Sequence, residues 1–165
     1  MKMLDKSETL GWLRSKNLLD VGGKVSVQSF IKIVESSLPP DSGRKTALSR
    51  AIASLFRYDE EAILWIDEFG IWPSSEDWHL FTTFRGSLGE QSQLYEKPGH
   101  LFSREDLVSI SSILAMTLYF IWGAVLYSPR QDLLVRVSHD EWIAIYCRDA
   151  TIGSEIVQDV KNYLG

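Results

Sequence analysis

The pattern of hydrophobic and polar positions along the chain predicts an alternation of helices and strands. Residues 47–56 carry apolar side chains at helical spacing, with arginine and lysine mostly on the other side, and predict an amphipathic helix. The continuous apolar run 62–66 is too short for most helices and predicts a strand that is buried on both faces. Residues 24–34 alternate in part and predict another strand. Helices are also expected at 4–13 and 154–164.

Three capping signatures, each a serine followed three positions later by an acidic residue, mark further helix starts. They predict helices over about 74–89, 103–122 and 138–147. Residues 124–128 and 133–137 flank a short loop that begins at Pro129 and predict a β-hairpin. The stretch 91–102 contains Pro98-Gly99 and is expected to be a loop.

This order of elements predicts the α+β class. Because the final hairpin is antiparallel and the earlier strands are separated by helices, we expect a mixed sheet of about four strands, with helices packed against it. The chain of 165 residues shows no internal repeat and no linker, which predicts a single α+β domain over residues 1–165. The uncharged run 110–127 reaches the length of about 18 residues at which a membrane span becomes a candidate. Its serine and threonine residues and the break at Gly123 favour a buried core helix followed by a strand.

Charge and cysteine content narrow the class of function. Lys and Arg number 17 against 22 Asp and Glu, and this net charge of −5 disfavours nucleic acid as a partner. The single cysteine, Cys147, excludes an internal disulfide and is typical of a reducing compartment. The first residues contain no apolar segment of signal-peptide length. We therefore expect a cytoplasmic protein that does not bind membranes.

Motifs for nucleotide or metal chemistry are incomplete. The stretch 43–46 has the outline of a phosphate loop, but Leu38 stands where that loop needs its first glycine, so no nucleotide cofactor is predicted. The three histidines, His79, His100 and His139, lack the short spacing of metal ligands. The fold could still bring them together, and an enzyme or a small-molecule or metal site around them is the alternative hypothesis. No catalytic residue and no cofactor are assigned.

One stretch combines acidic and aromatic residues in a way that composition does not predict. Between Arg57 and Arg85 there is no lysine or arginine, while carboxylates and large aromatic side chains alternate. Aromatic residues next to acids at the end of a strand are typical of surfaces that bind a partner. The candidate partner-binding residues are Asp67, Glu68, Trp72, Glu76, Trp78, His79 and His100. The aromatic residues could instead complete the core, and strand alternation predicts that the first two carboxylates point to opposite faces.

Several motifs resemble an uncharacterised family of small bacterial cytoplasmic proteins. They are the stretch 38–46 (LPPDSGRKT), the stretch 64–76 (LWIDEFGIWPSSE) with the His-Leu pair at 79–80, the stretch 98–102 (PGHLF) and the stretch 138–142 (SHDEW). The resemblance implies a bacterial cytoplasmic origin and carries no activity over to this chain. By analogy, other acidic bacterial proteins of this size are immunity partners of toxins.

The leading hypothesis is a non-enzymatic protein-binding module, of an immunity or regulatory type, whose acidic surface suits a basic protein partner. The two hypotheses differ in the site that they require. A binding module needs an exposed acidic and aromatic patch, whereas an enzyme or small-molecule binder needs a pocket with converging polar groups. The pattern leaves assembly into homo-oligomers open.

Overall fold

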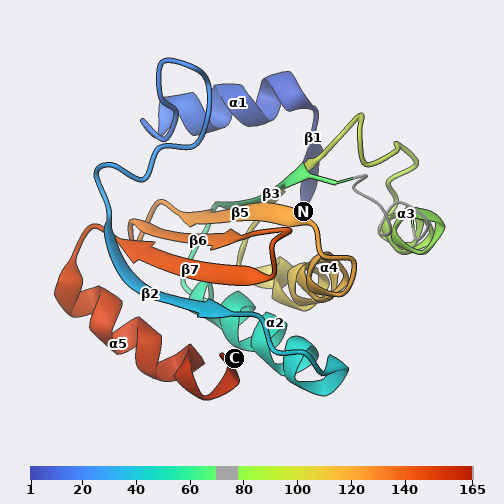
Figure 1. Ribbon diagram of the computed structural model, residues 1–165. Coiled ribbons are helices and arrows are strands. Elements are labelled where there is room, and N and C mark those ends of the chain that lie inside the picture. The colour runs from blue at the N-terminus through green and yellow to red at the C-terminus, as the bar shows by residue number, and fades with distance from the viewer. Residues whose placement is uncertain (70–77, 165) are drawn as a thin grey trace.

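The computed structural model describes residues 1–69 and 78–164, and within this part seven strands form one sheet (Figure 1). The strands are β1 (Lys2–Leu4), β2 (Ile31–Ser37), β3 (Ala62–Glu68), β4 (Gly99–Phe102), β5 (Gly123–Ser128), β6 (Leu133–Val137) and β7 (Trp142–Cys147). Their order across the sheet is β1-β4-β3-β5-β6-β7-β2, and every neighbouring pair is antiparallel. The helices are α1 (Lys6–Ser15), α2 (Ser42–Leu55), α3 (Trp78–Ser87), α4 (Leu107–Tyr119) and α5 (Ala150–Val160), with short 3-10 turns η2 (Arg104–Asp106) and η3 (Lys161–Tyr163).

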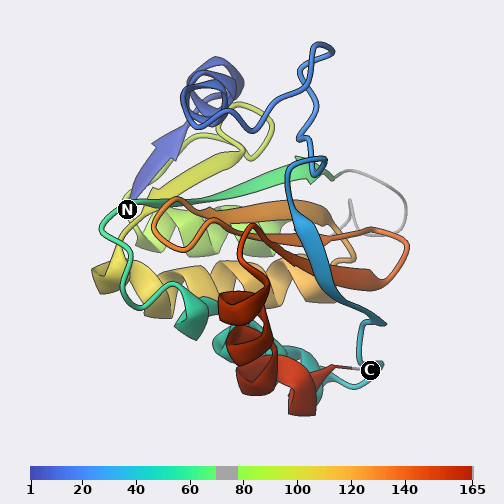
Figure 2. The same ribbon diagram turned by 90° about the vertical axis from the view of Figure 1, so that its left-hand side faces the viewer.

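The sheet separates two hydrophobic cores, because its central strands are buried on both faces. On one face α2, α4 and α5 cover side chains such as Leu64, Leu126 and Val135 (Figure 2). On the other face α1 covers Ile63 and Val125. Strand β3 is apolar on both sides for this reason, which confirms the prediction of a doubly buried strand at 62–66.

The first and second strands in sequence form the two opposite edges of the sheet. The chain between them, residues 5–30, therefore crosses the whole face from the β1 edge to the β2 edge (Figures 1 and 2). We call this segment the strap. It begins with α1, which Asp5 caps by accepting a hydrogen bond from the backbone N–H of Glu8, while the side chain of Glu8 accepts one from the N–H of Asp5. After α1 the strap continues without regular structure into β2.

The α+β class is confirmed, but the predicted mixed sheet of about four strands is wrong: the sheet has seven strands in the described residues and all are antiparallel. Strands β1 and β4 span three and four residues, too few for a periodic signal, and β4 lies where a loop was expected. The partly alternating stretch 24–34 forms a strand only from residue 31 onward.

The predicted helix at 138–147 is also wrong, because residues 142–147 form β7. The hydroxyl of Ser138 accepts a hydrogen bond from the N–H of Asp140 and does not cap a helix. Glu141 has a φ of 60°, and the N–H of Ser138 donates to the carbonyl of Trp142. Residues 138–141 therefore form the turn between β6 and β7. β-Branched and aromatic side chains in β7 favour the strand.

Other predicted elements are confirmed with shifted ends. The hairpin is β5 and β6, and the uncharged run divides into α4 and β5 as expected. Ser103 and Asp106 form the predicted capping box, although it opens η2 before α4 begins. The signature at Ser74 and Asp77 lies outside the described residues, and α3 begins after it. Among the described helices, none combines the length and the apolar character that crossing a membrane requires.

Candidate functional site

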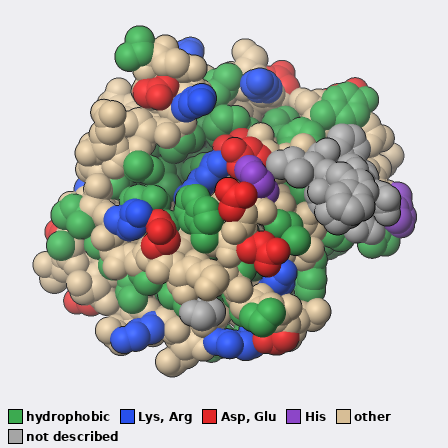
Figure 3. Space-filling model, viewed as in Figure 1, with side chains coloured by type: hydrophobic (Ala, Val, Ile, Leu, Met, Phe, Trp, Pro, Cys, Tyr) green, Lys and Arg blue, Asp and Glu red, His purple; other side chains and the backbone are tan. Residues whose placement is uncertain are grey.

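A cleft of about 700 Å³ lies between the strap and the face of the sheet that α1 covers. We call it the sheet cleft. Its lining consists of Lys6, Leu10, Gly22, Gly23, Lys24, Val25, Val27, Trp65, Asp67, Glu68, Leu134, Arg136 and Tyr146. In Figure 3, acidic, basic and histidine side chains gather beside a hollow between α1 and the sheet. A cavity of this volume is within the range that small ligands occupy in proteins.

The floor of the cleft is apolar and comes from three strands. Trp65 of β3, Leu134 of β6 and Tyr146 of β7 belong to the core on this face of the sheet. The register brings them to the same side, since Leu134 lies opposite both Tyr127 and Tyr146 and Trp65 lies opposite Val125, and residues opposite each other in a sheet share a face. Leu10 on α1 and Val25 in the strap pack against the same core and form the opposite apolar wall.

A charged cluster closes one end of the cleft. The Nη1 of Arg136 donates a short hydrogen bond to Oδ2 of Asp67, and its Nη2 lies 3.0 Å from Oε2 of Glu68. The Nδ1 of His139 lies 3.0 Å from the same Oε2 of Glu68. One guanidinium therefore joins two carboxylates, and the second carboxylate also contacts an imidazole.

A β-bulge explains why both carboxylates reach the same arginine. In the pairing of β3 with β5, Ile66 faces Ala124 but Glu68 faces Gly123, so Asp67 is the extra residue. A bulge interrupts the alternation of side chains and redirects the residue that follows it. The expectation that Asp67 and Glu68 point to opposite faces is therefore wrong at this point of the strand.

Gly123 makes room for the cluster from the neighbouring strand. A Cβ at this position would meet the side chain of Glu68, with the Cβ of Glu68 only 2.8 Å away. The absence of a side chain lets Glu68 lie against the backbone of β5 and reach Arg136. The glycine that appeared in the sequence as a break between helix and strand thus also shapes the site.

Asp67 is the most unusual titratable group of the cleft. Burial raises the pKa of its carboxyl above the ordinary value, although the charge of Arg136 acts in the opposite direction. Its Oδ1 is buried and has no hydrogen-bond partner within the described part of the chain. An acidic group with a shifted pKa and an unused acceptor in a cleft is typical of a binding or catalytic site.

The cationic side chains outnumber the carboxylates around the cleft. Lys6 on α1 and Lys24 in the strap line the wall opposite the sheet, and both residues are exposed. Arg136 forms ion pairs with both carboxylates of the charged cluster, Asp67 and Glu68. The cleft is therefore not the free acidic surface that the sequence suggested.

The residues predicted as a partner-binding surface occupy separate places. Asp67 and Glu68 line the sheet cleft, whereas Trp72 and Glu76 lie outside the described residues, as does the side chain of Trp78 at the start of α3. His79 is exposed on α3. His100 on β4 is fully buried, with Nδ1 3.2 Å from the carbonyl of Leu64, so it offers no surface to a partner.

The histidines of the alternative hypothesis do not form a metal site with other residues. No group of three or more His, Cys, Asp or Glu side chains in residues 1–69 and 78–164 is arranged to hold a metal ion. His139 contacts the charged cluster through Glu68, but His100 belongs to the core under β3 and β4. Only the first of these two is near the cleft.

Most residues that line the sheet cleft were not predicted from the sequence, although one pattern in the sequence points to Arg136. Arg136 is the only charged residue in the strand LLVRV, where alternation places it on the same face as Leu134. An arginine in an otherwise buried strand needs an acidic partner. The end of the other buried strand, with Asp67 and Glu68, supplies that partner.

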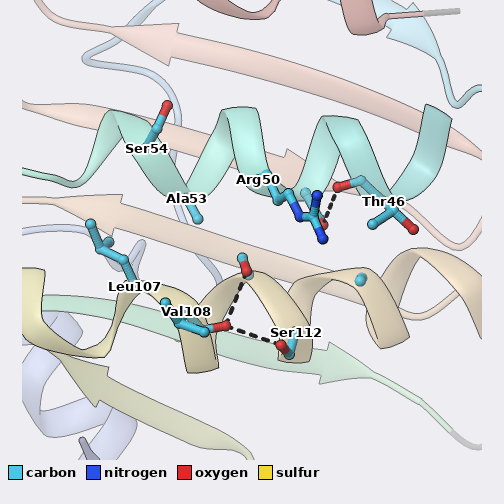
Figure 4. A pocket seen from close by; sticks show the side chains of 10 residues that line it. Thr46, Arg50, Ala53, Ser54, Leu107, Val108 and Ser112 are labelled. Atoms are coloured by element: carbon cyan, nitrogen blue, oxygen red, sulfur yellow. Dashed lines mark hydrogen bonds between the residues drawn. The ribbon is translucent and has the colours of Figure 1, made fainter. Parts of the chain in front are cut away.

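A second, smaller cavity of about 370 Å³ lies between α2 and α4 (Figure 4). Its lining is rich in hydroxyl groups, but these groups already bond to their own helices. Ser49 donates to the carbonyl of Thr46, and both Ser111 and Ser112 donate to the carbonyl of Val108. This arrangement leaves few groups that could recognise a ligand, and the sheet cleft is the stronger candidate.

Comparisons of the chain with family models, with curated proteins and with solved structures found no match. The resemblance to a family of small bacterial proteins consequently stays a prediction from the motifs.

Proposed function

We propose that the chain is a non-enzymatic recognition protein and that a segment of a partner protein binds in the sheet cleft. The observation that carries the proposal is the combination of an apolar floor with the Asp67–Arg136 pair at its end. Binding sites in proteins typically combine an apolar surface, which provides affinity, with a few polar groups, which fix orientation.

The exposed residues around the cleft favour a protein over a small molecule. Val21, Val27 and Ile31 all lie in or next to the strap and are exposed, Val21 fully. Val27 lines the cleft itself, and Val21 precedes the lining residue Gly22. A small ligand inside the cleft would leave such apolar surface in water, whereas a protein segment that extends over the strap would cover it.

The polar groups indicate which chemistry the segment brings. Oδ1 of Asp67 is a buried acceptor with no partner among the described residues, so the segment should offer an N–H or O–H donor there. Lys6 and Lys24 would repel a strongly basic segment. We therefore propose an apolar side chain with a neighbouring neutral donor, in place of the basic partner that the acidic stretch suggested.

A small molecule with the same chemistry is the second candidate. The volume of about 700 Å³ and the shifted pKa of Asp67 favour it, because both are typical of ligand sites. Such a ligand would have an apolar body and one donor group directed at Asp67.

Matched substitutions test the proposal. Val27→Asp places a charge in the lining of the cleft, and Val108→Asp places the same charge on α4, at a residue that is 81% exposed. A partner captured from the native cell by the wild-type chain should bind Val108→Asp equally well. Its purified form should bind Val27→Asp with a loss on the order of 2 kcal/mol, about 30-fold in Kd.

The result also separates the two candidates. Equal binding of the partner to both variants would exclude the sheet cleft as its site. Native mass spectrometry of the chain purified from its own cell would reveal a small ligand as an added mass that is absent from Val27→Asp. Circular dichroism must show that both variants are folded.

A further inference from the structure

Five buried nitrogen atoms that have no hydrogen-bond partner in residues 1–69 and 78–164 gather around one phenylalanine, away from the sheet cleft. They are Nε, Nη1 and Nη2 of Arg85, Nε2 of His100 and Nε1 of Trp122. The ring of Phe81 lies 5.6 Å from the guanidinium carbon of Arg85, 6.1 Å from the ring of His100 and 5.2 Å from that of Trp122. Three polar side chains from three parts of the chain thus share one neighbour.

An unpaired guanidinium in this position is costly. The side chain of Arg85 is fully buried, and no ion pair joins it to a carboxylate in residues 1–69 and 78–164. Burying a charge without a partner destabilises the folded state, and each unpaired buried polar group adds to that cost. Burial lowers the pKa of Arg85, but a guanidinium stays protonated at neutral pH.

The two carboxylates whose charges act on Arg85 already have hydrogen-bond partners of their own. Glu90 and Glu96 act on Arg85 only through their fields. Glu90 accepts hydrogen bonds from Ser92 and Lys97, and Glu96 accepts one from the N–H of Gln93. Neither carboxylate provides the contact that the guanidinium lacks.

The two donors of the cluster define the missing partner. A guanidinium and an indole N–H can only donate, so their partner must be an acceptor, whereas a neutral His100 donates from Nδ1 to the carbonyl of Leu64 and its Nε2 is itself an acceptor. Burial, and after it the charge of Arg85, lower the pKa of His100 to about 3, so the imidazole is neutral and leaves the cluster with a net positive charge. A neutral acceptor would not balance that charge, whereas an oxyanion would, and a guanidinium binds oxyanions through two parallel hydrogen bonds.

We propose that Arg85, with the indole N–H of Trp122, binds a small oxyanion of the carboxylate or phosphate type. This site is separate from the sheet cleft and does not depend on the function proposed for it. The expected role of the anion is to complete the packing between α3 and the sheet, since Arg85 and Phe81 belong to α3 and His100 to β4.

The experiment measures the thermal midpoint with sodium phosphate and with sodium acetate, each against sodium chloride at equal ionic strength and pH. Arg85→Met removes the charge with similar volume, and Arg50→Met removes an exposed arginine from α2 as the control. The wild type and Arg50→Met should show a rise in Tm that grows with the logarithm of the oxyanion concentration, about 5–10 °C at a hundredfold excess over Kd. Arg85→Met should not respond and should be at least as stable as the wild type without the oxyanion.

A spectroscopic readout reports on the site directly. The indole Nε1–H resonance of Trp122, assigned with Trp122→Phe, should move as the oxyanion is added to the ¹⁵N-labelled chain. A wild type without a saturable response to either anion would overturn the proposal. So would a response that Arg85→Met retains. A loss of stability in Arg85→Met without any anion response would show that the chain itself supplies the partner of Arg85.

If Arg85→Met does not fold, Arg85→Lys takes its place. Lysine keeps the charge but cannot form two parallel hydrogen bonds, so Kd for phosphate should rise at least about tenfold. An unchanged Kd in Arg85→Lys would contradict the assignment of Arg85 as the binding residue.

Discussion

Asp67 lines the sheet cleft and pairs with an arginine from a distant strand. The absence of lysine and arginine around Asp67 in the sequence made it a candidate binding-site residue. Its partner could not be predicted in the same way. Arg136 lies 69 residues away and reaches Asp67 only because β5 separates their strands in the register observed. A sequence pattern carries no information on such a register unless the strand order is known.

The raised pKa of Asp67 has a consequence for stability that pH should reveal. Between its unfolded and folded pKa values, the folded state keeps a proton that the unfolded state has lost. Stability from this group is therefore present at low pH and decreases as pH rises through the folded pKa. Asp67→Asn removes the dependence, so its free energy of unfolding relative to the wild type should increase from pH 3.5 to pH 7. The increase should be about 1.4 kcal/mol for each unit by which the pKa is raised.

Urea denaturation at a series of pH values measures this difference. Glu105→Gln, at an exposed residue of η2, controls for the loss of one negative charge from the molecule. A difference between Asp67→Asn and the wild type that stays constant with pH would show that burial does not shift this carboxyl.

At the scale of elements, local sequence patterns located the longer helices and strands well. They assigned residues 142–147 to a helix, whereas these residues form a strand. The apolar stripe of α2 and the hairpin of β5 and β6 follow from periodicity and turn chemistry. The signature at 138–141 fits both a helix start and a tight turn, because serine and acidic residues bond to nearby backbone in either. Residues 142–147 form a strand because they pair with β6 and β2, and such contacts are not local in the sequence.

Close packing of α5 on β2 gives a prediction at this scale. A Cβ on Gly153 would lie 2.6 Å from both Cγ1 and Cδ1 of Ile33, so Gly153→Ala should force α5 away from β2. We expect a loss of about 1–3 kcal/mol, partly offset by the better helix propensity of alanine. Gly11→Ala in α1 has no atom within 4 Å of the new Cβ and should instead stabilise the protein by about 0.5–1 kcal/mol. Chemical denaturation compares both variants with the wild type, and equal effects would exclude the contact as the cause.

At the scale of the whole molecule, the class of fold was predictable and the topology was not. The predicted helices and strands were enough to assign the α+β class, because each element can be recognised from its own stretch of sequence. The order of strands depends on contacts between distant segments, such as β1 with β4 and β2 with β7. The sheet cleft arises from that order, since its wall is the strap that joins the two edges. A site of this kind is not visible in the sequence, even when some of its residues are.

Between its two ends the strap pairs with no strand of the sheet and packs on the face through side chains such as Leu13 and Leu18, and this has a consequence for motion. Strand β1 contributes three residue pairs to the sheet, whereas β5, β6 and β7 form a continuous central meander. The strap can therefore detach while the meander stays intact, and this partial opening should govern hydrogen exchange in α1. Amide protons of β1 and α1 should exchange well before those of β6. A partner bound in the sheet cleft would slow exchange in the strap alone, because it must leave before the strap can open.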